Sequence, residues 1–406
     1  MIRNYLLSLI LVFSTLRLSA QFPFKYDNTI YKAVYLNEAF RLMEASPNHL
    51  LLDVRSPGEY ADTSSSTALN IGRIKGAINI NISDVPAHLT EIKKYIDQPV
   101  FVYCSHSQRS RRVSKLLAEN GFTKVYNING GMSQVNRTDN SSFPYKSKVL
   151  EINTAYKNVA SAEAISLLTS APGLVIIDIR TKEEFESKDT TLQNNIGRLK
   201  NAINIPQNVF ATKIDSYKIP VNKTILLYDL NGYNSMDVVD ILRAKGYTHI
   251  YNLFEGLSYL ASDHHLTPAL RTRLFTGLPP YQLVNPKTAI DLLVKYPDLV
   301  VLDTRSAEEF ENKAKHMNMG HLKGAILVSS IESLESAIAS KSNTTRFLVY
   351  GSGEDFSMLA CEALVKKGFT QVNFLSQGLY SLVWATANVE GCAGGKDFLV
   401  DHEGLY

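Results

Sequence analysis

Short, largely apolar runs alternate with amphipathic stretches along most of the chain. Residues 50–54, 100–103 and 125–128 form such runs, which are typical of strands that a sheet buries on both faces. Between them, residues 37–45 and 110–119 carry apolar side chains at helical spacing. Strands that alternate with helices predict an α/β fold, a mainly parallel sheet with helices on both faces.

This pattern occurs three times. "LLLDVRSPGEY", "VIIDIRTKEEF" and "VVLDTRSAEEF" place Asp53, Asp178 and Asp303 at intervals of 125 residues. "IGRIKGAINI", "IGRLKNAINI" and "MGHLKGAILV" follow them, and "ENGFTKVYNINGGM", "AKGYTHIYNLFEGL" and "KKGFTQVNFLSQGL" come later in the same order. A period this long exceeds that of solenoid repeats, so the copies are whole domains in tandem. The predicted domains span 30–136, 154–263 and 279–387, with a C-terminal tail over 388–406.

Composition narrows the class of protein. The chain has 406 residues, of which 45% are hydrophobic and 20% charged, as in soluble globular proteins with several cores. The formal net charge is only +3, which is too small to recruit nucleic acid by a global field. Any preference for anions must therefore be local.

The N-terminus predicts an export signal. In "MIRNYLLSLILVFSTLRLSAQ", Arg3 precedes an apolar stretch over 5–16, and small residues follow at Ser19 and Ala20. Such a stretch is short for a membrane span and typical of a signal peptide, here 1–20. We expect a periplasmic or secreted protein with no stable membrane insertion after processing. An uncleaved N-terminal anchor is the alternative.

The stretch "FVYCSHSQRSRR" at 101–112 carries the candidate chemistry. An apolar strand runs directly into Cys104, and a helix is predicted to begin near Ser110, a good N-cap residue. Active sites gather at the carboxyl ends of parallel strands, and a tight loop before a helix aims backbone amides inward as an anion cradle. With Arg109 beside it, Cys104 is predicted to be a nucleophile whose thiolate these groups stabilise. The alternative is a buried core thiol.

These motifs resemble those of the rhodanese family of sulfurtransferases. "LLLDVRSPGEY", "IGRIKGAINI", "VFVYCSHSQRS" and "VYNINGGM" match its Asp-x-Arg, Gly-x-Ile-x-Gly-Ala, active-site-loop and Gly-Gly markers in order. The resemblance covers 30–387 three times over and implies three tandem rhodanese-like domains. It implies a cysteine persulfide mechanism for the first domain alone, and we expect no metal and no cofactor. Family loops often carry Arg directly after the cysteine, where this chain has Ser105, so the substrate preference stays open.

The resemblance implies a two-step sulfur transfer. Cys104 takes the outer sulfur of a small anionic donor such as thiosulfate, and a thiophilic acceptor, cyanide or a thiol, removes it. Arg109 braces the loop or meets the donor, and His106 binds the donor, moves a proton or is merely an exposed loop residue. Arg111 and Arg112 attract substrate or form a solvated helix face. The predicted substrate-binding residues, mainly through their backbone amides, are Ser105, His106, Ser107, Gln108 and Ser110.

Loop length argues against phosphatase chemistry. Four residues separate Cys104 from Arg109, a length that in this family indicates sulfur rather than phosphorus. Related phosphatases place the arginine one position later, where this chain has Ser110. No side chain there would clamp phosphate bidentately.

The second and third domains lack this chemistry. Asp229 and Asn234 stand where the first domain has Cys104 and Arg109, and the third domain has Gly351 and Phe356 there. A carboxylate suits an anion cradle but cannot carry sulfane sulfur, so both domains are predicted to be non-catalytic. A binding, scaffold or redox-sensing protein, with Cys104 as a relic or sensor, is the alternative from a different functional class.

Two other pairs of residues carry structural expectations. Asp53 and Arg55 are predicted to form an ion pair that ties the end of a strand to its neighbours. Cys361 and Cys392 are an even pair in a compartment that permits disulfides. They either form a bridge or stay as two free thiols.

Overall fold

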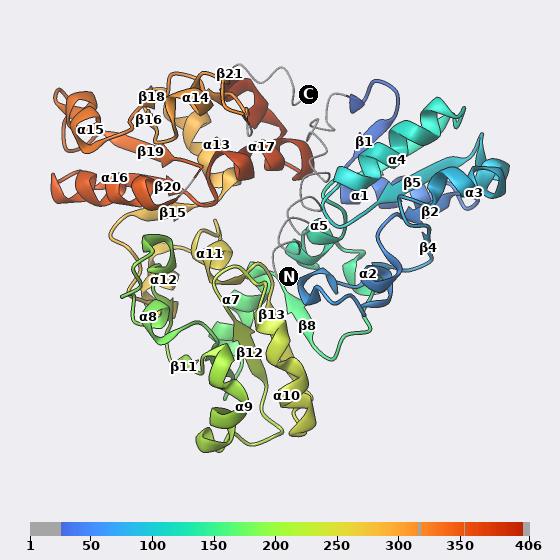
Figure 1. Ribbon diagram of the computed structural model, residues 1–406, viewed down its shortest axis with the longest axis horizontal. Coiled ribbons are helices and arrows are strands. Elements are labelled where there is room, and N and C mark those ends of the chain that lie inside the picture. Colours follow the sequence, from blue (N-terminus) through green and yellow to red (C-terminus); the bar gives the residue numbers. More distant parts are fainter. Residues whose placement is uncertain (1–25, 316–317, 353, 401–406) are drawn as a thin grey trace, which may run out of the picture.

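The computed structural model describes residues 26–315, 318–352 and 354–400. Three α/β domains surround a common centre (Figure 1). The predicted signal peptide lies outside the described residues. Within the described part of the chain, no helix has the length and apolar character that crossing a bilayer would need.

The first domain contains one five-stranded sheet whose neighbouring strands are all parallel. In spatial order the strands are β1 (Lys32–Val34), β6 (Lys124–Ile128), β5 (Pro99–Tyr103), β2 (Leu50–Asp53) and β4 (Ile78–Asn79). The helices are α1 (Leu36–Glu44), α2 (Pro57–Ala61), α3 (Val85–Ile92), α4 (Gln108–Glu119) and α5 (Gly131–Arg137). Separate hydrophobic clusters join α1 and α5 to one face of the sheet and α3 and α4 to the other. The predicted sheet with helices on both faces is confirmed.

The second and third domains repeat this order of strands. The second sheet runs β8 (Lys157–Val159), β13 (Ile250–Leu253), β12 (Ile225–Tyr228), β9 (Val175–Asp178), β11 (Ile203–Asn204). Its helices are α7 (Ser161–Ser170), α8 (Lys182–Phe185), α9 (Phe210–Lys213), α10 (Val239–Ala244) and α11 (Gly256–Ala261). The third sheet runs β15 (Gln282–Val284), β20 (Gln371–Leu375), β19 (Arg346–Tyr350), β16 (Val300–Asp303), β18 (Ile326–Leu327). Its helices are α13 (Pro286–Lys295), α14 (Ala307–Phe310), α15 (Ile331–Ile338), α16 (Glu354–Lys366) and α17 (Gly378–Asn388).

The segment that follows each sheet folds back onto its own domain. β7 (Leu150–Glu151) pairs antiparallel with β3 (Arg73–Ile74), and β14 (Phe275–Thr276) pairs with β10 (Arg198–Leu199). The segment predicted as a C-terminal tail supplies the third copy, because β21 (Leu399–Val400) pairs with β17 (His321–Leu322). The repeating unit therefore also includes the segment after each sheet, which lies outside the predicted domain boundaries.

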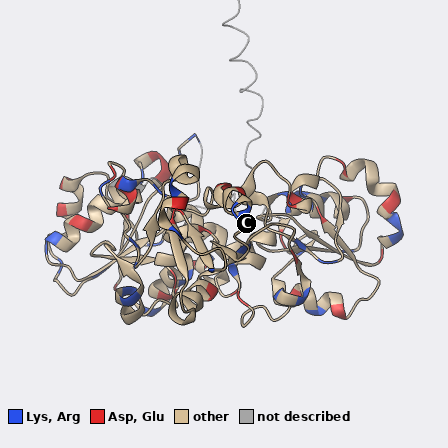
Figure 2. Cartoon of the chain, turned by 90° about the horizontal axis from the view of Figure 1, so that it is seen from below, with Lys and Arg blue, Asp and Glu red and all other residues tan. Residues whose placement is uncertain are grey.

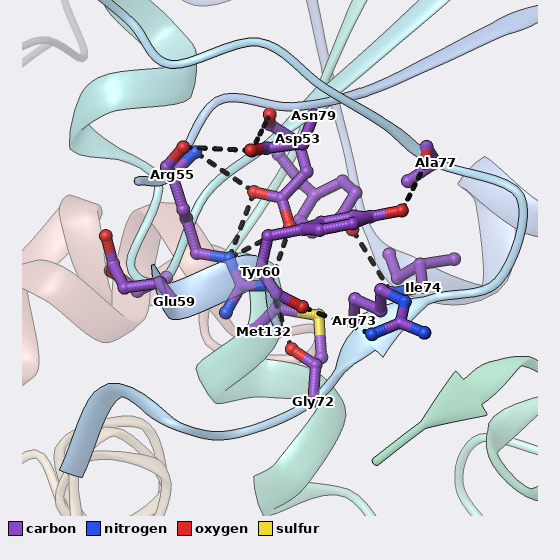
Figure 3. A network of polar contacts seen from close by, with 12 residues as sticks. Asp53, Arg55, Glu59, Tyr60, Gly72, Arg73, Ile74, Ala77, Asn79 and Met132 are labelled. Atoms are coloured by element: carbon purple, nitrogen blue, oxygen red, sulfur yellow. Dashed lines mark hydrogen bonds and ion pairs between the residues drawn. The ribbon is translucent and has the colours of Figure 1, made fainter. Parts of the chain in front are cut away.

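The Asp-x-Arg motif forms a buried ion pair in every domain. Arg55 donates through Nη2 to Asp53 Oδ2 at 2.6 Å and to the Gly72 carbonyl at 2.8 Å, and both charged side chains are fully buried (Figure 3). The equivalent pairs, Asp178–Arg180 and Asp303–Arg305, reach the carbonyls of Gly197 and Gly320. Each pair joins the carboxyl end of an interior strand (β2, β9 or β16) to the glycine carbonyl that precedes the next short strand. This confirms the predicted structural role.

The two cysteines of the third domain are both free thiols. Cys361 lies in α16 within a hydrophobic cluster that the second and third domains share. Cys392 packs in a different cluster around α13 and α17. Burial raises the pKa of Cys361 well above its ordinary value and that of Cys392 to about 11. The disulfide alternative is therefore wrong for this fold.

Candidate active site

The loop after β5 begins at Cys104 and enters α4 at Gln108. The helix starts two residues earlier than predicted, and Ser107, not Ser110, precedes it. Ser107 has a φ of 74°, a left-handed conformation that disfavours residues other than glycine. The Ser107 hydroxyl accepts a hydrogen bond from the Gly130 amide at 2.6 Å, which helps to hold this conformation.

Arg109 is the brace of this loop. Its guanidinium donates to both carboxylate oxygens of Glu59, at 2.6 and 2.7 Å, and to the Ser105 hydroxyl at 2.9 Å. Burial alone would raise the pKa of Glu59, but hydrogen bonds from Arg109 and from the Ser56 backbone hold it at about 2. Burial would lower the pKa of Arg109, yet Glu59 and the nearby Cys104 raise it overall. Of the two predicted roles for Arg109, the geometry favours bracing the loop.

The loop serines direct their hydroxyls toward the protein. Ser105 accepts from Arg109, and Ser107 donates to the Ile128 carbonyl at 3.3 Å. Ser110 donates to Asn127 at 2.6 Å and is fully buried. The hydroxyls of these three serines are therefore already engaged within the protein.

At the Gly-Gly marker, the start of α5 packs directly against the Cys104 loop. The Met132 amide donates to the Cys104 carbonyl at 2.9 Å, and the Ser133 amide does the same to Ser105. A Cβ added at Gly131 would lie 2.1 Å from the Cys104 carbonyl oxygen, and Gly131 has a φ of 52°. Only glycine fits this contact, so this residue fixes the loop although the sequence identified it only as a marker.

The second domain shows what the same loop holds when the cysteine is replaced. Asp229 occupies the position of Cys104, is only 4% exposed, and turns its carboxylate into the loop. That carboxylate accepts hydrogen bonds from the amides of Gly232, Asn234 and Ser235, the last at 3.0 Å. Burial nevertheless raises the pKa of Asp229. The predicted fit of a carboxylate to this cradle is confirmed, and the side chain at this position points into the loop.

The equivalent loop of the third domain keeps the backbone hydrogen bond to the following helix, but it has glycine, Gly351, at the position of Cys104. The Leu379 amide donates to the Gly351 carbonyl at 3.2 Å, as Met132 does to Cys104. Phe356, in the place of Arg109, is half-buried. Neither residue can act as a nucleophile or bind an anion.

Helix α17 of the third domain packs beside the Cys104 loop. Arg111 is only 1% exposed, forms an ion pair with Asp27 at 2.8 Å and donates to Asn388 at 2.8 Å. Trp384 donates from Nε1 to the His106 carbonyl at 3.4 Å. Arg111 is therefore neither a solvated residue nor free to meet substrate, whereas Arg112 is exposed.

The exposed loop residues line a cavity at the junction of the three domains. His106 and Gln108 form part of its wall, and its volume is about 860 Å³. His106 is exposed to the cavity, but enclosure by the cavity walls, together with the nearby Arg137 and Arg109, lowers its pKa to about 4. His106 is therefore neutral near pH 7 and brings no positive charge to a donor.

Asp263, His264 and His265 lie together on the cavity wall and include atoms of the type that bind metal ions. The Asp263 carboxylate already accepts a hydrogen bond from the His265 amide at 2.8 Å, and the His265 ring lies equally close.

Several curated proteins match single domains of this chain. "Uncharacterized protein YqhL" of Bacillus subtilis is 38% identical over 21% of this chain and 58% of its own length. "Thiosulfate sulfurtransferase GlpE" of Tolumonas auensis is 28% identical over 25% of this chain and 84% of its own. "tRNA uridine(34) hydroxylase" of Cytophaga hutchinsonii is 30% identical over 23% of this chain but only 28% of its own. The matched part is thus less than two thirds of the Bacillus and Cytophaga proteins.

A solved structure and a family model each match most of this chain. A crystal structure of thiosulfate sulfurtransferase from Pseudomonas aeruginosa aligns with 86% of this chain and 67% of its own, at 15% identity and a TM-score of 0.22. The family model of the rhodanese-like domain matches residues 36–138, 161–263 and 285–383, which together make up about three quarters of the sequence. The chain therefore belongs to the rhodanese-like sulfurtransferase family and contains three tandem rhodanese-like domains.

Proposed function

We propose that the first domain transfers sulfane sulfur through a persulfide on Cys104 and that the other two domains have no catalytic cysteine chemistry. The observation that carries this proposal is the position of Asp229. Its carboxylate fills the amide cradle of the second domain, and Cys104 stands at the same place in the first. A persulfide anion on Cys104 would take the place of that carboxylate.

The first step forms the persulfide. The Cys104 thiolate attacks the outer sulfur of a donor such as thiosulfate, a new S–S bond forms, and the S–S bond of the donor breaks. Its electron pair leaves with sulfite. The loop amides stabilise the charge on the terminal sulfur, and Arg109, held by Glu59, keeps the loop in place for this step.

The second step returns the enzyme to its starting state. An acceptor nucleophile attacks the terminal sulfur, the persulfide S–S bond breaks, and the Cys104 thiolate leaves. With cyanide the product is thiocyanate, and with a thiol it is the acceptor's own persulfide. The thiol proton passes to solvent.

A thiosulfate:cyanide assay on the purified protein tests this function. The wild type and a Cys361→Ala control should release thiocyanate, since Cys361 lies in α16 of the third domain. Cys104→Ser should release none. Turnover by Cys104→Ser would refute the proposed nucleophile.

We also propose that the protein is exported and cleaved near Gln21, as the sequence pattern predicts. N-terminal sequencing of the extracytoplasmic protein should begin at or near Gln21. An intact Met1 in a membrane fraction would favour the anchored alternative.

A further inference from the structure

The central cavity is built by all three domains. Helices α5, α11 and α17 converge there (Figure 1), and each contributes lining residues, among them Arg137, Tyr259 and Trp384. Its volume of about 860 Å³ lies within the range of roughly 300–1,000 Å³ found for small-molecule sites. The cavity therefore has the size of a small-molecule site.

This cavity adjoins the Cys104 loop. His106 and Gln108, two of the five residues between Cys104 and Ser110, line it. Trp384 fixes the rim through its hydrogen bond to the His106 carbonyl. A molecule bound in the cavity is therefore next to the loop that carries the proposed persulfide.

Several aromatic rings line the wall. Tyr233 is 66% exposed and Tyr380 is 43% exposed although both are large side chains. Arg137 lies 4.2 Å from the centroid of the Trp384 ring and 5.6 Å from that of Tyr259. Exposed rings of this kind offer stacking and cation–π surface to an organic ligand.

The charge of the wall is negative, although both signs are mixed over the molecule as a whole (Figure 2). Two basic residues line the cavity: Arg137 is paired with Glu255, and Lys287 with Asp291. Four acidic residues line it, namely Asp139, Glu255, Asp263 and Glu390. This excess of carboxylates, in a site walled by protein, repels anions and attracts cations.

We propose that the central cavity binds the sulfur acceptor, and that the acceptor is a small organic thiol that is uncharged or cationic. This inference rests on the proposed function of Cys104. The acceptor thiolate attacks the terminal persulfide sulfur, its own persulfide forms, and the Cys104 thiolate is released. The second and third domains thereby supply acceptor specificity to a reaction that the first domain performs.

Discharge of the preformed persulfide by three small thiols tests this proposal. The probes are cysteamine, 2-mercaptoethanol and 3-mercaptopropionate, which are cationic, neutral and anionic, with rates compared per thiolate. Cysteamine should exceed 3-mercaptopropionate by about tenfold at low ionic strength, with a smaller difference at high salt. Equal rates for the three thiolates would overturn the proposal.

A matched pair of variants locates the effect. Glu390→Lys changes the charge of the cavity wall, and Asp298→Lys makes the same charge change on an exposed turn outside the cavity. Glu390→Lys should reduce the preference for cysteamine by about threefold or more, and Asp298→Lys should leave it unchanged. Equal responses of the two variants would refute the cavity as the acceptor site. If no persulfide forms at all, the proposed function of Cys104 fails, which is a separate outcome.

Discussion

Arg109 and Glu59 are joined by two parallel hydrogen bonds of 2.6 and 2.7 Å. The arginine lies at the start of α4 and the glutamate in α2, 50 residues earlier in the chain. The Glu59 side chain is only 4% exposed and that of Arg109 is 29% exposed, so water competes little for the carboxylate. Because Arg109 also holds Ser105, the pair fixes the loop from both sides.

Removal of this brace should slow persulfide formation. Arg109→Ala is expected to lower the rate by about a hundredfold, a typical loss for one preorganised electrostatic contact. Arg109→Lys should recover part of the rate, since lysine keeps the charge but not the bidentate geometry. Single-turnover kinetics with thiosulfate measure this. The exposed neighbour Arg112→Ala is the control, and an equal loss in that variant would contradict the role of Arg109.

The same ion pair predicts an acid-sensitive contribution to stability. The pKa of Glu59 is about 2 in the fold against an ordinary value of 4.5. A lowered pKa stabilises the fold above pH 4.5, and this stabilisation disappears as the pH falls toward 2. Urea unfolding should therefore show wild type more stable than Glu59→Gln at pH 7, with a difference that shrinks between pH 4.5 and 2. A difference that does not change over this range would exclude the pair as its source.

The close contact at Gly131 predicts an unusually costly substitution. Gly131→Ala should lower both the free energy of unfolding and the rate of persulfide formation, because the new Cβ would meet the Cys104 carbonyl at 2.1 Å. Gly76 also has a positive φ, of 83°, but has nothing within 4 Å. Gly76→Ala should therefore show only the backbone cost, roughly 1–2 kcal/mol. Similar losses in both variants, measured by denaturant unfolding, would argue against the contact.

The occupied cradle of the second domain predicts a loss of stability without a loss of activity. Asp229→Asn replaces one of the two carboxylate oxygens that accept from three loop amides by an NH2 donor. At least one amide then loses its acceptor, which should cost about 1–3 kcal/mol. Sulfur transfer should stay at the wild-type rate, since this loop has no thiol. The exposed Asp240→Asn is the control for loss of one negative charge. A marked fall in transfer by Asp229→Asn would mean that the second domain takes part in the chemistry.

The sequence was sufficient to predict the repeated fold. Buried strands, amphipathic helices and the spacing of Asp53, Asp178 and Asp303 are local patterns, and three copies make each pattern easier to identify. The Asp53–Arg55 pair was also predictable, because two charges at the end of an apolar strand must be paired if they are buried. The absence of a thiol at Asp229 and Gly351 can be read directly from the sequence, and the prediction that both domains are non-catalytic rests on it.

Features that depend on tertiary placement were not predictable in this way. Glu59 reaches Arg109 only because α2 packs beside the loop, and its signal in the sequence is that of a helix cap with Ser56. Arg111 and Asn388 meet across two domains, and no local pattern fixes how domains dock. The central cavity belongs to the same class of feature, because its walls come from all three domains.

The most direct test of the central claim is the intact mass of the protein after incubation with thiosulfate. We predict a gain of one sulfur atom in the wild type, mapped to the peptide that contains Cys104, and no gain in Cys104→Ser. Cys361 and Cys392 should stay unmodified, because burial raises the pKa of both thiols and so lowers their thiolate fraction. A sulfur adduct in Cys104→Ser would contradict the assignment of the nucleophile. A wild type that forms no persulfide with any sulfane donor would contradict sulfur transfer itself and favour a binding or scaffold protein.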